Sequence, residues 1–214
     1  MPVHDELTST ITWSAADSFT RCPRLFYWSY RALLTGEPQN KYITRGVDVH
    51  RLLEIWYKTK NIDMVRETLS LTKYNDLDYL ERFIVWYHEN FNDDIQAFSG
   101  MVETELAVTL PGIEGVVYRG KVDLYLPDTQ TVKDHKTTGK ANGKHWLRTA
   151  NGGQLQCYSF ALMSMGWPVK RGALNVLCWT EKQRAWRHYG PEVPISEESI
   201  TPWVRYLRDT ALAI

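Results

Sequence analysis

The amino-acid sequence predicts a mixed α/β domain in which a central mixed sheet is flanked by helices and preceded by a helical extension. Three observations predict this fold class. Apolar residues recur at helical spacing in the first 98 residues, alternate with polar residues between 101 and 136, and return to helical spacing later. The predicted strands therefore fall in the middle of the chain, with helices on either side.

The helical part begins with an interrupted helix. Ser14, with Asp17 three positions later, fits a helix N-cap, and Pro23 should divide the following stretch into two short helices. Longer amphipathic helices are predicted over Gly46 to Tyr57 and Asp76 to Ile95. The apolar positions that predict these helices are Phe19, Cys22, Phe26 and Tyr30, then Val49, Leu52, Leu53 and Trp56, then Leu77, Leu80, Ile84, Tyr87 and Phe91.

Strands are predicted where the period becomes two. Residues 101–110, 115–126 and 130–136 alternate in polarity and are separated by Pro-Gly and Pro-Asp turn signals, which predicts a three-stranded meander. We expect a helix from Gln154 to Met165, a strand ending near Thr180, a hairpin partner around Trp186 and a last helix after Ser196. The chain is then one domain, 1–214, with a mainly helical part (1–98), a sheet core (99–190) and a C-terminal helix (191–214).

Composition limits the possible locations and partners. The 25 basic residues balance 25 acidic ones, so net charge gives no overall attraction to nucleic acid or to an anionic membrane. The start, MPVHDELTST, lacks the features of a signal peptide, and no apolar run approaches the roughly 18 residues of a membrane span. We expect a cytoplasmic protein without a membrane partner. Cys22, Cys157 and Cys178 are widely spaced and contain no CxxC pair, which favours reduced thiols.

Two carboxylates and an ammonium group are predicted on neighbouring strands. Asp123 lies on one strand, and Asp134 and Lys136 share one face of the next. Phosphodiester hydrolysis uses such a set, because carboxylate oxygens hold Mg²⁺ or Mn²⁺ and a cation lies beside the attacking water. The alternative is an ordinary surface salt bridge, and a D-x-K triplet alone is weak evidence.

Further polar residues accompany this set. His50 lies on a predicted helix, where a half-buried surface histidine is the alternative to a metal ligand. Glu103 and Glu105 precede the strand of Asp123. Gln154 and Tyr158 lie one helical turn apart, where both could also be plain helix-face residues.

With these motifs in order, residues 11 to 165 resemble the RecB-like and Cas4-like branch of the PD-(D/E)XK nuclease superfamily. The resemblance implies a restriction-endonuclease-like core and a metal-dependent DNA nuclease. Six ordered motifs are much more specific than any one of them. They are SAADSFTRCPRLFYWSY (14–30), RGVDVH (45–50), VETEL (102–106), GKVDLYL (120–126), VKDHKTT (132–138) and QLQCY (154–158).

The resemblance also implies a role for each matching residue. Lys136 becomes the catalytic lysine, and Gln154 and Tyr158 match a Q-x-x-x-Y motif that shapes the active site. An additional acidic residue falls on Glu103 or Glu105, and we prefer Glu103 for its spacing to the following apolar positions. The cation is Mg²⁺ or Mn²⁺, and a histidine ligand favours Mn²⁺. The implied metal ligands are His50, Asp123, Asp134 and the backbone carbonyl of His135.

Many members of this branch hold an iron–sulfur cluster with four cysteines, one near the N-terminus and three near the C-terminus. Here Cys22 takes the first place, but no cysteine follows Cys178. Only three thiols exist where four are needed, so we predict no cluster and assign Cys22 to core packing.

Two groups of residues are predicted to contact DNA. Trp146, placed in a loop beside Lys140, Lys144 and Arg148, could stack on a base of a single strand while the cations contact phosphates. Arg21 and Arg24 form a second possible phosphate contact. Two other signals are interpreted as coincidences: the G-x-x-x-x-G-K skeleton at 115–121, which has Val122 where Ser or Thr is required, and the pair Cys157 and His145, for which no oxyanion hole can be located.

The resulting hypothesis is a DNA nuclease, preferably an exonuclease, that acts in DNA end processing, recombination or replication and is encoded by a phage or a bacterium. One alternative is a binding module that lost its chemistry, although the presence of Asp123, Asp134 and Lys136 opposes it. Another is a subunit that depends on a helicase or a single-strand annealing protein to supply DNA affinity.

Overall fold

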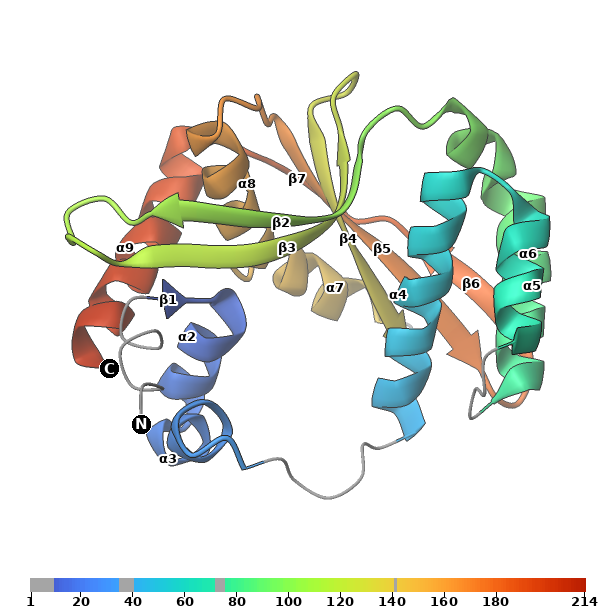
Figure 1. Cartoon of the computed structure of the whole chain (residues 1–214), viewed down its shortest axis with the longest axis horizontal. Helices are drawn as coiled ribbons and strands as arrows, with labels where there is room; N and C mark the ends of the chain where they lie inside the picture. Colours follow the sequence, from blue (N-terminus) through green and yellow to red (C-terminus); the bar gives the residue numbers. More distant parts are fainter. Residues whose placement is uncertain (1–9, 35–40, 72–75, 141) are drawn as a thin grey trace.

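The computed structural model describes residues 10–34, 41–71, 76–140 and 142–214, so the segment 1–9 that bears on the signal-peptide prediction lies outside the described residues. One mixed sheet runs through the molecule (Figure 1). Its strands are β1 (Thr10–Ile11), β2 (Met101–Thr109), β3 (Val117–Leu126), β4 (Thr131–Thr138), β5 (Arg171–Thr180), β6 (Ala185–Tyr189) and β7 (Glu192–Pro194). The predicted meander is confirmed, because β2, β3 and β4 pair in order and antiparallel.

Helices cover both faces of this sheet. In one layer, α4 to α6 pack with Leu124, Leu177 and Trp186; in the other, α8 and α9 pack with Val122 and Val176. Alternate residues along the strands thus point into two separate hydrophobic cores, one on each face of the sheet. The helices are α2 (Trp13–Arg21), α3 (Pro23–Phe26), a π-helical turn η1 (Tyr27–Arg31), α4 (Lys41–Thr59), α5 (Ile62–Leu71), α6 (Leu77–Ala97), α7 (Gly143–Ala150), α8 (Gln154–Ser164) and α9 (Glu197–Ala213).

The predicted mixed α/β fold is confirmed, with local corrections near the N-terminus. The N-cap of α2 is Thr12 and not Ser14, because β1 ends at Ile11 and the Thr12 hydroxyl accepts a hydrogen bond of 3.1 Å from the Ala15 amide. Pro23 does divide the stretch into two helices. Cys22 lies at that break and is exposed, so its assignment to core packing is wrong.

The apolar stripes of the longer helices are buried except for Phe91, which is half-buried, and Leu77, which is exposed. Val49, Leu52, Leu53 and Trp56 of α4 are at most 1% exposed, whereas Leu77, the first residue of α6, is 48% exposed. Leu77 lies directly after the N-cap Asp76, where the helix has not yet reached the core. None of the helices in the described ranges is long and apolar enough to cross a membrane.

The β3 strand shares one of its edges between two partners. β2 pairs along the other edge from Val117 to Tyr125. On the shared edge, β1 pairs parallel with residues 117 and 118, and β4 pairs antiparallel with residues 124 to 126. Between these two pairings, the edge of β3 from Arg119 to Asp123 has no strand partner among the described residues.

Helix α2 is held against helix α9, far away in the sequence. The Tyr206 hydroxyl donates a hydrogen bond of 2.9 Å to the Ala16 carbonyl and lies 2.8 Å from the Thr20 hydroxyl. The rings of Trp13 and Trp203 meet edge to face, with centroids 5.5 Å apart. These contacts fix the position of the N-terminal helix beside the sheet.

Helix α4 crosses β4 at Gly46. A Cβ atom on Gly46 would lie 2.9 Å from the Thr137 Oγ1 atom, so a glycine permits this close approach. We expect Gly46→Ala to lower the free energy of unfolding, because a clash of about 1–3 kcal/mol exceeds a helix-propensity gain of about 1 kcal/mol. In a Thr137→Ala background the same change should stabilise the protein. Urea unfolding of the four variants checks this, and equal effects of Gly46→Ala in both backgrounds would contradict it.

Candidate active site

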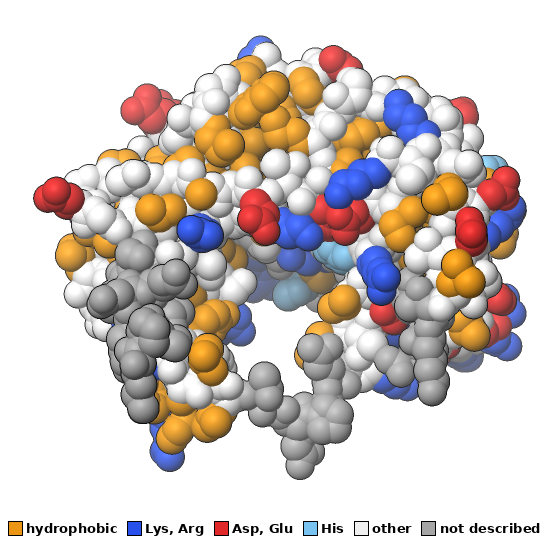
Figure 2. All heavy atoms as spheres, in the orientation of Figure 1, with side chains coloured by type: hydrophobic (Ala, Val, Ile, Leu, Met, Phe, Trp, Pro, Cys, Tyr) orange, Lys and Arg blue, Asp and Glu red, His pale blue; other side chains and the backbone are white. Residues whose placement is uncertain are grey.

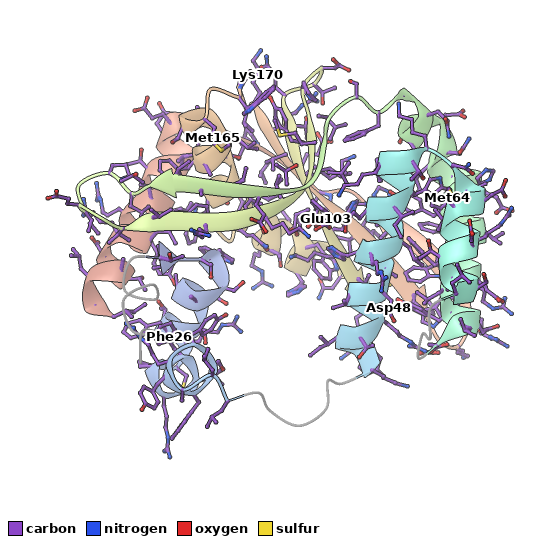
Figure 3. All side chains as sticks on the ribbon, viewed as in Figure 1. Phe26, Asp48, Met64, Glu103, Met165 and Lys170 are labelled. Atoms are coloured by element: carbon purple, nitrogen blue, oxygen red, sulfur yellow. The ribbon has the colours of Figure 1, made fainter. Side chains whose placement is uncertain are left out.

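The residues singled out in the sequence come from five elements that meet at one hollow. Helix α4 contributes His50, β2 contributes Glu103, β3 contributes Asp123, β4 contributes Asp134 and Lys136, and α8 contributes Gln154. A cleft of about 670 Å³ is lined by residues that include His50, Glu103 and Lys136. Figure 2 shows acidic, basic and histidine side chains gathered where the surface is hollowed between the N-terminal helices and α4, and Figure 3 places Glu103 near the crossing of β2 and β4.

Asp123 lies where β4 separates from β3. The last paired residues are Leu124 and Lys133, so Asp123 and Asp134 face each other one step beyond the ladder. The Asp123 carboxylate replaces the lost backbone partner, since its Oδ2 accepts a hydrogen bond of 2.6 Å from the His135 amide. The divergence of the strands thereby leaves two buried carboxylates next to each other.

His50, Glu103 and Asp123 form a group that is compact enough to hold a metal ion. Their nearest ligand atoms all lie within 4.8 Å of one another. His50 Nδ1 is 3.6 Å from both Glu103 Oε1 and Asp123 Oδ2. His50 Nε2 is 3.1 Å from the His135 carbonyl oxygen, and Nδ1 faces the Glu103 and Asp123 carboxylates.

The electrostatics of this group favour a cation. Burial, together with the neighbouring charge of Asp134, raises the pKa of Asp123 to about 7. Burial alone would lower the pKa of His50, but the carboxylates of Glu103, Asp123 and Asp134 outweigh it and raise that pKa. Buried negative charge is thus left in excess, and a divalent cation can neutralise it in place of protons.

Asp134 stands apart from the three-residue group. Its Oδ2 atom is 2.8 Å from the Lys136 ammonium, yet it has no partner in hydrogen-bond geometry among the described residues. A buried carboxylate oxygen without a hydrogen bond is costly. This oxygen, the Asp123 and Glu103 carboxylates and the His50 imidazole are the donor types that Mg²⁺ or Mn²⁺ accepts, so the residues present fit such an ion.

The structure distinguishes Glu103 from Glu105. Glu103 is in the group, and its backbone has φ +45°, which is uncommon for a residue with a side chain. The distortion lies opposite Asp123 in the β2–β3 ladder. Lys121, which the sequence analysis did not single out, is 2.7 Å from Glu103 Oε2. Its position two residues before Asp123, on the same strand face, was the available signal.

The ring of His135 is held by contacts in the interior. It is buried, its Nδ1 atom lies 2.7 Å from the Asn175 amide nitrogen, and that amide also donates to the Tyr87 hydroxyl at 3.3 Å. Burial lowers the pKa of His135 well below its usual range, so the ring is neutral. The interior contacts hold the residue whose backbone amide and carbonyl contact Asp123 and His50.

Lys136 is held by a chain of polar contacts. Its ammonium donates a hydrogen bond of 3.0 Å to Gln154 Oε1, and Gln154 Nε2 donates one of 2.9 Å to the Tyr158 hydroxyl. Burial is the largest cause of the raised pKa of Tyr158, and this raised pKa keeps the hydroxyl protonated. The Q-x-x-x-Y motif therefore forms a support for the lysine, built on the first turn and a half of α8.

We expect Gln154→Ala to lower kcat about ten- to hundredfold with little change in KM, because a misplaced catalytic group reduces the rate and not ground-state binding. Tyr158→Phe should cost less, since its hydroxyl acts through Gln154. Single-turnover cleavage assays compare the two, with the exposed Gln183→Ala as a control. A larger loss for Tyr158→Phe than for Gln154→Ala would contradict this order.

The predicted DNA contacts are only partly exposed. Trp146 lies on helix α7 and not in a loop, and it is 8% exposed within the core beneath the sheet, so the prediction of an available stacking ring is wrong. The asparagine cap at Asn142 starts this helix. Lys140, Lys144, Arg148, Arg21 and Arg24 are exposed, and Arg21 pairs with Asp17. Their contact with DNA stays a prediction.

Comparison with known proteins gives the family. The model of the PD-(D/E)XK nuclease superfamily matches residues 10–214, and the chain belongs to this superfamily. The crystal structure of a candidate exonuclease from Eubacterium rectale aligns with a TM-score of 0.64 and 10% identity over 100% of this chain and 85% of that one. The alkaline exonuclease of Laribacter hongkongensis aligns at 0.44 and 11% identity, over 97% and 89%. No curated protein sequence matches.

Proposed function

We propose that this protein is a divalent-metal-dependent deoxyribonuclease that acts as an exonuclease on DNA ends. The observation that supports this most is the convergence of His50, Glu103 and Asp123 beside a lysine that Asp134 and Gln154 hold at the same cleft. The alternative of an ordinary surface salt bridge does not account for it, because Asp123 and Asp134 are buried. The superfamily and the fold of the Eubacterium rectale protein support the same class of reaction.

The side chains of the site have separate roles in the proposed reaction. His50, Glu103, Asp123 and Asp134, with the His135 carbonyl, would hold Mg²⁺ or Mn²⁺, which when bound polarises the phosphate and lowers the pKa of water. Lys136 places a positive charge beside Asp134, where it orients the attacking water and stabilises charge on the phosphate oxygens. Attack on phosphorus in line with the leaving oxygen breaks the P–O3′ bond. The products carry a 5′-phosphate and a 3′-hydroxyl.

The substrate and setting are parts of the same proposal. Lys140, Lys144, Arg148, Arg21 and Arg24 are candidate phosphate contacts on DNA. We place the activity in end processing during recombination or replication in a bacterial cytoplasm or a phage-infected cell. Since the chain carries 25 basic and 25 acidic residues, a helicase or annealing protein could supply the missing affinity.

The test is cleavage of labelled DNA with Mg²⁺, Mn²⁺ or EDTA. Linear and circular substrates, each single- and double-stranded, separate end-dependent from internal cleavage. We expect cleavage of linear DNA that EDTA abolishes and added Mn²⁺ restores. Absence of cleavage by the folded protein, with and without a partner, would overturn the proposed function; cleavage of circular DNA would overturn only the exonuclease part.

A further inference from the structure

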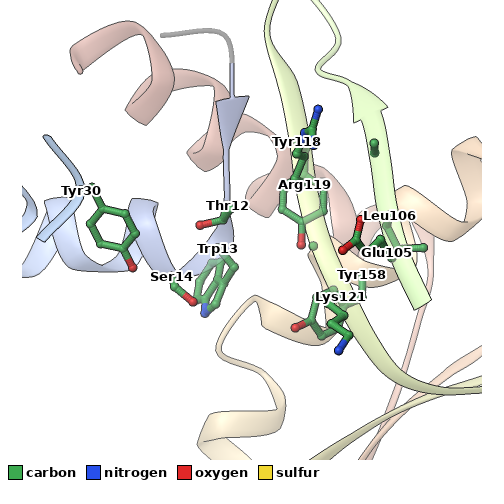
Figure 4. A pocket seen from close by; sticks show the side chains of 12 residues that line it. Thr12, Trp13, Ser14, Tyr30, Glu105, Leu106, Tyr118, Arg119, Lys121 and Tyr158 are labelled. Carbon is green, nitrogen blue, oxygen red and sulfur yellow. The ribbon is translucent and has the colours of Figure 1, made fainter. Parts of the chain in front are cut away.

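A second cavity, of about 480 Å³, lies next to the cleft (Figure 4). We call it the side cavity. Its volume falls within the roughly 300–1,000 Å³ of small-molecule sites. Lys121 lines both the side cavity and the active-site cleft, so the two are neighbours. The residues of the side cavity that carry the argument are Trp13, Tyr30, Ala107, Tyr118, Arg119 and Lys121.

The side cavity arises from the shared edge of β3. β1 pairs only with residues 117 and 118, and β4 pairs only from 124 onward, so a gap opens beside Arg119 to Asp123. After β1 the chain turns into α2, which brings Trp13 to the margin of this gap, as Figure 4 shows. Gly120 lets Tyr118 and Tyr158 lie against the strand, since a Cβ atom there would be 2.8 Å from the Tyr118 hydroxyl.

Its lining combines aromatic rings with unpaired polar groups. Trp13 and Tyr30 are half-buried. Tyr118 is 0% exposed, and its buried hydroxyl has no hydrogen-bond partner within the described part of the chain. An orphaned buried hydroxyl of this kind is costly unless something outside the described chain completes it. A planar heterocycle with ring nitrogens and carbonyl groups can stack on the aromatic rings and form a hydrogen bond with the Tyr118 hydroxyl.

Charged side chains extend along β3 from the side cavity to the catalytic carboxylates. Arg119, Lys121 and Asp123 are successive residues of one face of β3, each roughly 6.5–7 Å from the next. That spacing resembles the separation of neighbouring phosphates on a strand. Arg119 is exposed, forms no ion pair with any described residue, and lies opposite the small Ala107. Glu105, opposite Lys121, is a lining carboxylate and leaves Arg119 as the more favourable position for phosphate.

We propose that the side cavity binds the base of a nucleotide next to the scissile phosphate, on a single strand of DNA, with a neighbouring phosphate on Arg119. This inference rests on the proposed nuclease function and names the part of the substrate that the site recognises beyond the reacting group. Aromatic stacking and a phosphate contact are the usual means of holding single strands without reading their sequence.

Two substitutions with matched controls test the side cavity. Ala107→Phe fills it from an exposed position of β2, and Thr109→Phe places the same ring two residues further on the same face, outside the cavity. Arg119→Ala removes the cation, and Arg205→Ala removes an exposed arginine of α9 that does not line the cavity. The substrates are short single-stranded oligonucleotides that carry one abasic nucleotide at successive positions from the cleaved bond. Each variant is assayed for kcat and KM in Mn²⁺.

We expect one abasic position to lower kcat/KM of the parent protein roughly tenfold, and Ala107→Phe to lower it similarly on intact DNA. The two losses should not add, because both remove the same contact. Arg119→Ala should raise KM about fivefold or more with kcat unchanged, and both controls should match the parent protein. If Ala107→Phe does not fold, Arg119→Ala with the abasic series gives the answer.

Other results overturn the inference in distinguishable ways. If the parent protein cleaves DNA but no abasic position matters, or if Ala107→Phe behaves like Thr109→Phe, or if the losses add, the side cavity does not bind a base and the nuclease function stands. If Arg119→Ala lowers kcat and leaves KM unchanged, the phosphate contact is wrong. If the parent protein cleaves no substrate with either metal, the proposed function fails and this inference fails with it.

Discussion

Replacement of Lys136 by alanine should lower the rate of DNA cleavage roughly a hundred- to ten-thousandfold, the range usual for loss of a positioned acid–base or charge-stabilising group. The ammonium is the basic group that lies 2.8 Å from Asp134 and 3.0 Å from Gln154, and alanine leaves no cation there. Binding of DNA should change little, since we propose that exposed cations elsewhere contribute most phosphate contacts. The loss should therefore appear in kcat.

The measurement is single-turnover cleavage of linear DNA in Mn²⁺, with fluorescence anisotropy for DNA binding. Lys182→Ala, at an exposed turn after β5, is the matched control for loss of one positive charge. Circular dichroism and thermal unfolding establish that both variants are folded. A rate for Lys136→Ala within threefold of the parent protein would show that this lysine is not part of the chemistry.

Asp123→Asn should abolish cleavage and yet leave the metal-free protein at least as stable as the parent. Cleavage should fall at least a hundredfold, because a carboxylate that faces His50 and Glu103 is replaced by a neutral amide. The amide oxygen can still accept from the His135 amide. Stability should rise on the order of 1 kcal/mol, because an ionised carboxyl no longer has to be buried.

The sign of the stability effect follows from the pKa of Asp123, which is raised to about 7 in the folded protein. A raised pKa contributes stability at low pH, and this contribution disappears as the pH rises through about 7. The advantage of Asp123→Asn over the parent protein should therefore be larger at pH 8 than at pH 6. Thermal unfolding at both pH values, with EDTA and then with Mn²⁺, measures it.

Addition of Mn²⁺ should raise the melting temperature of the parent protein and not that of Asp123→Asn, because a cation that binds only the folded state stabilises it by mass action. Asp128→Asn, in the turn after β3, is a matched control for loss of an exposed carboxylate. An equal rise in the melting temperatures of Asp123→Asn and of the parent protein would show that the cation binds elsewhere.

The sequence predicted the elements whose pattern is strong and local. The amphipathic helix around His50, the meander and the helix that starts at Gln154 all follow from periodicity and turn residues, and all are present. Helices α5 and α7 were missed. Helix α7 is short, and its sequence, GKHWLRTA, contains a glycine at its start and only two large apolar side chains, Trp146 and Leu147. Tertiary packing of Trp146 and Ala150 stabilises it.

The order of the candidate site residues was predictable from the motifs, but their geometry was not. Alternation put Asp134 and Lys136 on one face of β4; it did not show that β4 leaves β3 beside Asp123. The contact of Lys121 with Glu103 depends on a β2 backbone distortion at Glu103, and sequence periodicity carries no signal for that. The burial of Trp146 likewise depends on packing from strands that are distant in the sequence.

The attachment of α2 to α9 has a consequence for biosynthesis. Trp13 and Ala16 are made after β1 but before the other described helices and strands, whereas Trp203 and Tyr206, which hold them, belong to α9, the last of these elements. A chain that is still on the ribosome can form the β2–β3 hairpin early, because its partners are close in sequence, but it cannot dock α2 until α9 has emerged. The margin of the side cavity that Trp13 forms is therefore completed last, after synthesis of the described chain is nearly complete.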